Sequence, residues 1–223
     1  MPLFSIIALS CFIISQGTII IAYLIGIQYD HPMVETCNPY LQGCLNITDV
    51  GIFSPEGYVF RGGMITACAF FMMWWVSNYY IAQQTLGVRP KRLVWSSILG
   101  LIGSVLLIIS TALLVPPRGD INWTLHVICA TSFFLVTFFA QALDLWLCIS
   151  KQHILAIEHK SLMAKKAAVA VQAIMIAVFL ALEALGVGDN IRNAIEWWLA
   201  LLIAVYFGSA YWDWKRISIN VHR

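Results

Sequence analysis

Six long stretches of this 223-residue chain are apolar and contain very few charged side chains. They are residues 3–27, 57–83, 93–115, 121–150, 167–185 and 193–212. A helix needs about 20 apolar residues to cross the hydrocarbon core of a bilayer. Hydrophobic residues make up 61% of the chain and charged residues 11%, against roughly 25% charged residues in a soluble domain. The sequence therefore predicts an all-α, polytopic membrane protein, in which residues 1–223 form one six-transmembrane-helix bundle.

Several classes of function are excluded by the same composition. The formal net charge of +2 is too small to indicate a nucleic-acid surface. Of the five histidines, only His126 lies within a predicted span, and no Cys or His cluster has the spacing of a zinc site. Neither a nucleophile elbow nor a phosphate loop is found in the sequence. We therefore expect no metal, no cofactor and no nucleic-acid partner.

The positions of Lys and Arg predict how the bundle is oriented. With six spans, both ends of the chain lie on one side of the membrane. Three of the 13 basic residues, Arg61, Arg118 and Arg192, fall on the opposite side, and the other ten lie on the side of the termini. Because cytoplasmic loops carry an excess of basic residues, we predict that both termini are cytoplasmic.

The longest connection, residues 28–56, is then expected in the lumen or outside the cell. It carries Cys37, Cys44 and a glycosylation sequon that begins at Asn46. An oxidising compartment permits a disulfide between the two cysteines, and the alternative is a pair of free thiols. We expect the disulfide, and we take Asn46 as a candidate glycosylation site in a host that has the machinery.

Charged and ionisable residues within spans are costly and therefore informative. Four of them, Arg61, His126, Glu183 and Glu196, come from four different helices. At 1.5 Å rise per residue, all four lie within roughly 8 Å of the predicted lumenal boundary. We take them as a candidate polar cluster or lipid-headgroup site, with Arg61 bonded to Glu196 or Glu183. The alternative is that each side chain reaches the lumenal headgroups separately.

Two acidic residues lie at the predicted cytoplasmic end. Asp144 falls near the end of the fourth span, and Asp213 sits beside Lys215 and Arg216 at the end of the sixth. Their positions are explained by snorkelling or by local pairing. We therefore assign both of them structural roles.

Motifs in the lumenal connection and in the last span resemble those of a known family. The connection contains Pro39-Tyr40 and then Asp49-x-Gly51-x-x-x-Pro55-Glu56-x-x-x-Phe60. The last span begins Ala194-Ile195-Glu196-Trp197, and its exit reads Asp213-Trp214-Lys215-Arg216-Ile217-Ser218. These features, together with His126 near the start of the fourth span, are similar to those of the DRAM/Frag/Sfk superfamily. The resemblance extends along nearly the whole chain, and it also implies six spans.

The resemblance also assigns a second group of candidate residues, the loop motif Asp49, Gly51, Pro55 and Glu56. We interpret the motif as structural rather than as substrate contact. Gly51 permits a tight turn, Pro55 fixes the chain before the second span, and Glu56 favours the N-terminus of that helix.

The superfamily includes autophagy modulators, a Golgi factor for remodelling the lipid of GPI anchors, and a yeast plasma-membrane partner of phosphatidylinositol 4-kinase. The resemblance thus implies a membrane protein of lipid homeostasis, membrane trafficking or autophagy, in an endomembrane (lysosome or Golgi) or the plasma membrane. The leading hypothesis is non-enzymatic, with lipid-headgroup binding or partner recruitment. The alternatives are a lumenal-leaflet lipid-remodelling enzyme that uses His126 and Glu196, and an accessory subunit of a larger membrane complex. The expected partners are membrane lipids and proteins of such a complex.

Overall fold

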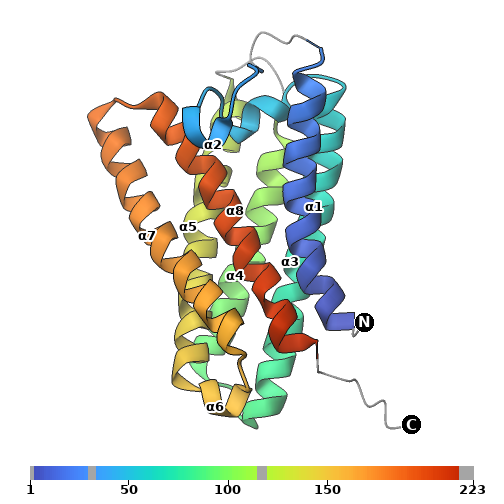
Figure 1. The fold of residues 1–223 in the computed structure, drawn as a ribbon, viewed down its shortest axis with the longest axis vertical. Helices are drawn as coiled ribbons and strands as arrows, with labels where there is room; N and C mark the ends of the chain where they lie inside the picture. The colour runs from blue at the N-terminus through green and yellow to red at the C-terminus, as the bar shows by residue number, and fades with distance from the viewer. Residues whose placement is uncertain (1–2, 30–33, 115–119, 216–223) are drawn as a thin grey trace.

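The computed structural model describes residues 3–29, 34–114 and 120–215 of the chain. Within this part the secondary structure is helical, with no strand. Six long helices are joined by connections that contain two short α-helices and one 3-10 helix (Figure 1). The elements in chain order are α1 (Leu3–Gly26), α2 (Pro39–Gln42), η1 (Ile47–Gly51), α3 (Glu56–Leu86), α4 (Lys91–Ala112), α5 (Ile121–Ser150), α6 (Gln152–Leu155), α7 (His159–Leu185) and α8 (Asp189–Trp214).

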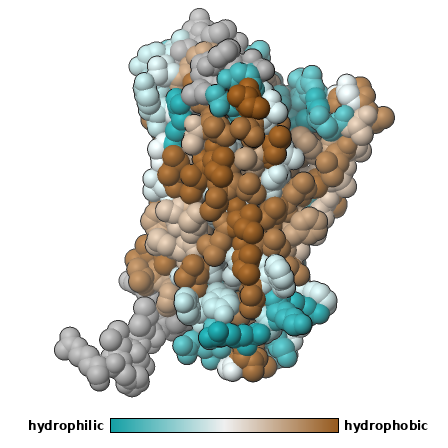
Figure 2. Space-filling view, turned by 180° about the vertical axis from the view of Figure 1, so that it is seen from behind, coloured by the Kyte–Doolittle hydropathy of each residue, from teal (hydrophilic) through white to brown (hydrophobic). Residues whose placement is uncertain are grey.

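All six long helices are long and apolar enough to cross a membrane. In the space-filling view a broad apolar band lies between two hydrophilic ends (Figure 2). The six predicted spans are therefore confirmed, and the protein is an integral membrane protein. Helix α1 begins and α8 ends at the same end of the bundle, which we call the terminus end (Figure 1). The opposite end carries α2 and η1, and we call it the loop end. The assignment of the terminus end to the cytoplasm stays a prediction.

The predicted helix limits agree with the structure to within four residues, except at the start of α7. This helix begins at His159, eight residues before the predicted start, so the connection after α5 is shorter than expected. Lys160, Lys165 and Lys166 therefore belong to a helix and not to a loop. The first eight residues of α7 were missed because their lysines interrupt the apolar run that marks a span.

Aromatic side chains fill the core toward the terminus end. The indoles of Trp74 and Trp75 on α3 are fully buried against Phe207 of α8, and the Nε1 of Trp74 donates to the Phe207 carbonyl at 3.1 Å. Gly100 of α4 lies directly against the ring of Trp75, so that a side chain there would overlap the indole. Helix α4 therefore approaches α3 closely at Gly100, where it packs against an aromatic ring.

Helix α7 is attached to the bundle mainly by its first half. Its buried residues are Ser161, Leu162, Lys165, Ala168 and Gln172, and none of residues 173–185 is buried. Figure 1 shows α7 along the outer edge of the molecule, next to α8. This arrangement leaves space between α5 and the second half of α7.

Candidate functional site

A pocket with a volume of about 430 Å³ lies at the loop end, between α5, α7 and α8. Its walls are polar toward the loop end and apolar toward the middle of the bundle. The apolar part includes Ala130, Phe134, Ile176, Phe179 and Leu199. The polar part is formed by side chains of η1 and its N-cap and of the loop-end turns of the three helices: Asn46, Thr48, Asp49, His126, Glu183, Asp189, Arg192, Asn193 and Glu196. The pocket is therefore amphipathic along the direction of the helices.

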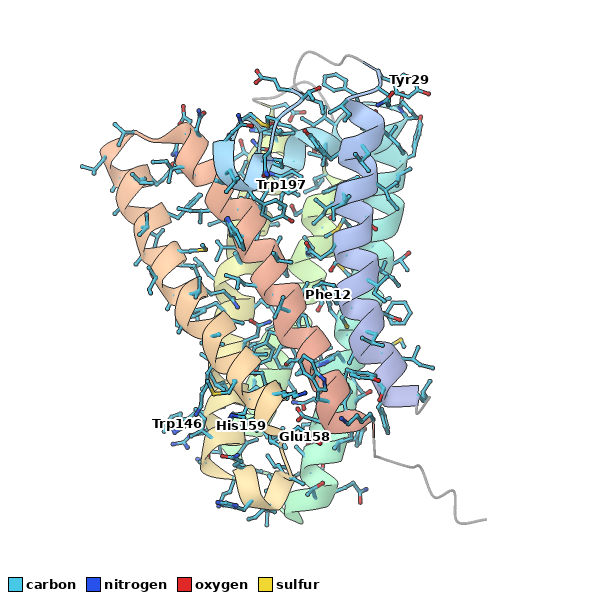
Figure 3. All side chains as sticks on the ribbon, viewed as in Figure 1. Phe12, Tyr29, Trp146, Glu158, His159 and Trp197 are labelled. Atoms are coloured by element: carbon cyan, nitrogen blue, oxygen red, sulfur yellow. A yellow bond between two sulfur atoms is a disulfide. The ribbon has the colours of Figure 1, made fainter. Side chains whose placement is uncertain are left out.

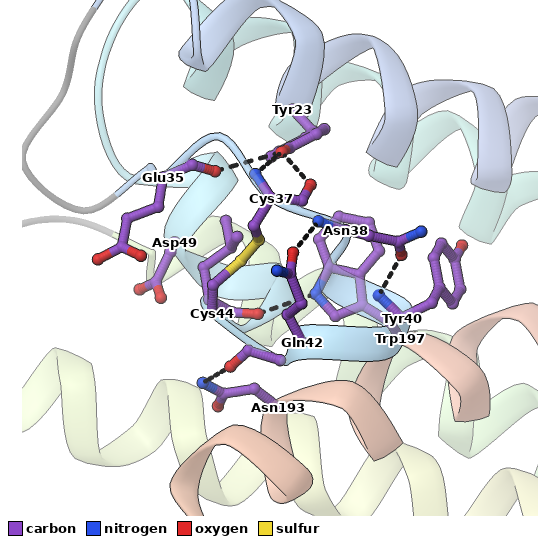
Figure 4. Close-up of a disulfide and its surroundings, with 12 residues drawn as sticks. Tyr23, Glu35, Cys37, Asn38, Tyr40, Gln42, Cys44, Asp49, Asn193 and Trp197 are labelled. Atoms are coloured by element: carbon purple, nitrogen blue, oxygen red, sulfur yellow. Dashed lines mark hydrogen bonds between the residues drawn. A yellow bond between two sulfur atoms is a disulfide. The ribbon is translucent and has the colours of Figure 1, made fainter.

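Helix α8 holds the loop that contributes Asn46, Thr48 and Asp49 to the pocket wall. The Nε1 of Trp197 donates to the Leu45 carbonyl at 3.0 Å, and the Nδ2 of Asn193 donates to the Gly43 carbonyl at 3.0 Å. One turn below Asn193, the Oε2 of Glu196 accepts from the backbone N–H of Ile47 at 3.2 Å. Figure 3 shows Trp197 pointing from α8 toward the loop, and Figure 4 shows its bond. Glu196 is thus part of the contact between α8 and η1 as well as of the pocket wall.

The predicted disulfide between Cys37 and Cys44 is present, and it closes the loop around α2 (Figure 4). The Tyr23 hydroxyl of α1 donates to the Cys37 carbonyl at 2.6 Å and accepts from the Cys37 N–H at 2.9 Å. Tyr40 packs edge-on against Trp197 at 5.4 Å between ring centroids. Burial raises the pKa of the Tyr40 phenol, so the ring stays neutral. The disulfide loop is therefore held by α1 on one side and α8 on the other.

His126 is buried at the wall of the pocket, and both of its ring nitrogens are engaged. Its Nδ1 lies 2.8 Å from the carbonyl oxygen of Ser110 on α4, which only accepts, so Nδ1 carries a proton. Its Nε2 lies 3.1 Å from the Thr48 hydroxyl of η1, and in the neutral ring it accepts from that hydroxyl. Trp123 stacks on the imidazole at 5.3 Å between ring centroids. His126 thus joins α4, α5 and η1.

The structure brings together three members of the predicted cluster: His126, Glu183 and Glu196 line the pocket. Arg61 lies elsewhere, and its guanidinium donates to the carbonyls of Gly57 at 3.1 Å and Leu114 at 3.2 Å. Within the described residues Arg61 forms no ion pair with Glu183 or Glu196. The predicted pairing of Arg61 with a glutamate is therefore wrong, and its partners are these backbone carbonyls.

Arg192 of α8 is the cation at the pocket. It bonds to Glu183 across the α7–α8 connection and to Asp189 one turn away. The distribution of basic residues along the chain predicts that Arg192 lies at this end, but it predicts no partner for Arg192. Its neighbours Glu183 and Asp189 lie at spacings of nine and three residues. In the sequence, the signal for this pairing is that Glu183, Asp189 and Arg192 flank one short turn between two helices at the same membrane boundary.

The loop motif has mainly structural contacts. Asn46 is the N-cap of η1: its side chain accepts from the Asp49 N–H at 3.0 Å, and the Asp49 Oδ2 accepts from the Asn46 N–H at 3.2 Å. This reciprocal capping box satisfies backbone groups at the start of the helix. Asn46 also lines the pocket, and the hydroxyl of its sequon residue Thr48 is bonded to His126. Glycosylation of Asn46 stays a prediction.

Of the other three motif residues, Pro55 and Glu56 are at the start of α3 and Gly51 is at the end of η1. Pro55 precedes the helix and the fully buried Glu56 is its first residue, as predicted. Gly51 was expected to permit a tight turn, but it ends η1 and serves close packing instead. A Cβ atom there would lie 2.5 Å from the Cδ1 atom of Phe60 and 2.6 Å from the Cδ2 atom of Leu114.

A second polar cluster, at the terminus end, was not predicted as such. Asp213 of α8 accepts from Lys165 Nζ at 2.8 Å, from the Ser161 hydroxyl at 2.6 Å and from the Glu158 N–H at 3.0 Å. Lys165 is 2% exposed and its partner 6%. Asp213 is therefore buried and paired across helices, which corrects the expected pairing with Lys215; Arg216 lies outside the described residues.

Asp144 belongs to the same region and does not snorkel. It accepts from the Asn78 amide at 2.8 Å and from the Tyr206 hydroxyl at 2.7 Å, and it is 2% exposed. Asp144, Lys165 and Asp213 line one small cavity of about 40 Å³. The predicted structural role of both aspartates agrees with this geometry. Their carboxylates are stabilised by buried hydrogen bonds that join four helices, and not by snorkelling or local pairing.

The six-span bundle and its buried polar groups define a helical integral membrane protein with an amphipathic pocket at the loop end. Residues 3–217 match the family model described as "Frag1/DRAM/Sfk1/Cwh43P N-terminal domain". The chain belongs to this family, as the resemblance of its motifs implied. No curated protein and no solved structure matches it.

Proposed function

We propose that this protein binds a membrane lipid, with the lipid head group in the polar part of the loop-end pocket. The observation that carries the proposal is the amphipathic division of that pocket, whose volume of about 430 Å³ is within the usual range for small-molecule sites. The apolar residues Phe134, Ile176 and Phe179 face the space between α5 and α7, where an acyl chain can lie. Membership of the family supports a role in lipid homeostasis, membrane trafficking or autophagy.

The proposal is tested by filling the pocket. Ala130 lines it on α5, so Ala130→Phe places a ring in the apolar part. Ile128→Phe is the matched control, because Ile128 is on the same helix, is 55% exposed and does not line the pocket. Each variant is purified in mild detergent, and the bound lipid is measured by native mass spectrometry.

We expect lipid bound to the wild type and to Ile128→Phe, and a loss of affinity of about tenfold in Ala130→Phe, equivalent to 1.4 kcal/mol. Equal lipid binding by the two variants would contradict the proposal, provided that both elute as a single folded species.

A second candidate function, lipid remodelling by an enzyme, is favoured by the contact between Thr48 and His126. A hydroxyl 3.1 Å from an imidazole nitrogen at a pocket wall has the geometry of a nucleophile and its general base. The experiment is incubation of the purified protein with ester-linked phospholipids and GPI-type lipids, with products followed by mass spectrometry. Turnover that disappears in Thr48→Val and His126→Gln would support the enzyme; no product from either class of lipid would exclude these substrates.

A further inference from the structure

The polar part of the pocket is rich in acidic groups. Glu183, Asp189 and Glu196 line it, and Arg192 is the one Lys or Arg among its described lining residues. Arg192 is already bonded to Glu183 and Asp189. Its guanidinium therefore has protein carboxylates as partners and offers little unneutralised positive charge to a ligand.

Glu196 has no cationic partner among the described residues. Its Oε2 accepts one hydrogen bond, from the Ile47 N–H, and no Lys or Arg of that part of the chain forms an ion pair with it. His126, on the same wall, donates from Nδ1 to Ser110 and has Nε2 engaged by Thr48. A carboxylate at the wall of a membrane pocket is costly unless a donor or a cation offsets it.

We propose that the lipid bound in this pocket carries a primary amine in its head group, as in phosphatidylethanolamine, and that its ammonium group donates to Glu196. This inference rests on the proposed lipid-binding function. An ammonium group has three N–H donors and forms short, charge-assisted hydrogen bonds with carboxylates. A head group with a net negative charge meets the acidic groups of the pocket without a free cation to offset it. The acyl chains lie against the apolar residues of α5 and α7.

The experiment compares three lipids with identical acyl chains, each titrated into the purified full-length protein and followed by native mass spectrometry. The lipids are phosphatidylethanolamine, phosphatidylcholine and phosphatidylglycerol. We expect phosphatidylethanolamine to bind about tenfold more tightly than phosphatidylglycerol, because like-charge contacts oppose the anionic head group. Phosphatidylcholine keeps the positive charge but has no N–H donor, so we expect it to bind severalfold more weakly than phosphatidylethanolamine.

Two results would overturn the inference while leaving the proposed function in place. Phosphatidylglycerol binding at least as tightly as phosphatidylethanolamine would exclude a cationic head group. Equal binding of phosphatidylcholine and phosphatidylethanolamine would exclude donation from a primary amine. If none of the three lipids bound and the wild type also retained no lipid after purification, lipid binding itself would be refuted.

Variants locate the effect at the pocket. Glu196→Gln keeps the side-chain size and its amide oxygen can still accept from Ile47, and it should remove most of the preference for phosphatidylethanolamine over phosphatidylglycerol. Glu35→Gln is the matched control, because Glu35 is exposed at the same end of the bundle and does not line the pocket. Asp189→Asn serves as a second test that does not threaten folding, since that side chain is 81% exposed. Unchanged preference in both pocket variants would overturn the assignment.

Discussion

Replacing Lys165 by methionine removes the single ammonium group from the polar cluster at the terminus end. In the structure its Nζ lies 2.8 Å from the Oδ2 of Asp213, and the side chain is 2% exposed. Lys165, Asp213 and Asp144 line one cavity. The substitution therefore leaves the Asp213 carboxylate without its cationic partner, in a cavity that the buried Asp144 also lines.

The expected cost follows from this geometry. Removing one partner of a buried ion pair destabilises a protein by about 3–5 kcal/mol. Asp213 keeps two other donors, Ser161 and the Glu158 N–H, so we expect the lower end of that range for Lys165→Met. Asp213→Asn leaves the ammonium in a cavity that Asp144 also lines, so we expect that carboxylate to offset part of its charge and the cost to be only about 1–2 kcal/mol. The double variant should lose less than the sum of the two single variants.

The measurement is equilibrium unfolding in mixed micelles of SDS and a mild detergent, followed by tryptophan fluorescence. Lys166→Met is the matched control, because Lys166 is the next residue and is exposed. Its free energy of unfolding should remain within about 0.5 kcal/mol of the wild type. If Lys165→Met were no less stable than Lys166→Met, or if Asp213→Asn were the more damaging change, the charge argument would be refuted.

Three further predictions concern the loop end and the topology. Gly51→Ala should lower the free energy of unfolding by about 1–3 kcal/mol, because the added methyl group overlaps Phe60; a fully stable variant would exclude the tight packing. Cys37→Ser should cost about 2.5 kcal/mol through the lost cross-link between residues seven apart, and a reducing agent should destabilise the wild type but not the variant. Tags at the two termini should both be digested by protease added to the cytoplasmic face; protection of either tag would contradict the predicted orientation.

The spans could be predicted from the sequence because crossing a bilayer requires only length and apolarity within each helix. The disulfide was also predictable, since Cys37 and Cys44 are the two cysteines of one loop outside the spans. The start of α7 was not. Lys165 made this segment look like a basic loop, and its charge is offset by Asp213, which is 48 residues away in the chain.

The candidate site was predictable in its depth but not in its pairing. His126, Glu183 and Glu196 were placed at one membrane boundary from the spans alone, and the structure gathers all three around one pocket. Arg61 lies near the same boundary but bonds to the carbonyls of Gly57 and Leu114. The depth of a residue follows from counting along its helix, whereas its partners depend on how each helix is rotated and which helices are neighbours.

The six apolar segments alone predict six membrane crossings, both ends of the chain on one side, and ionisable span residues near each of the two membrane boundaries. The packing of the helices, in contrast, anchors α7 by its first half, pairs Arg192 and not Arg61 with Glu183, and leaves an amphipathic pocket between α5, α7 and α8. The physical reason is that hydropathy is a property of each segment, while pockets and ion pairs arise from side-chain packing between segments far apart in the chain.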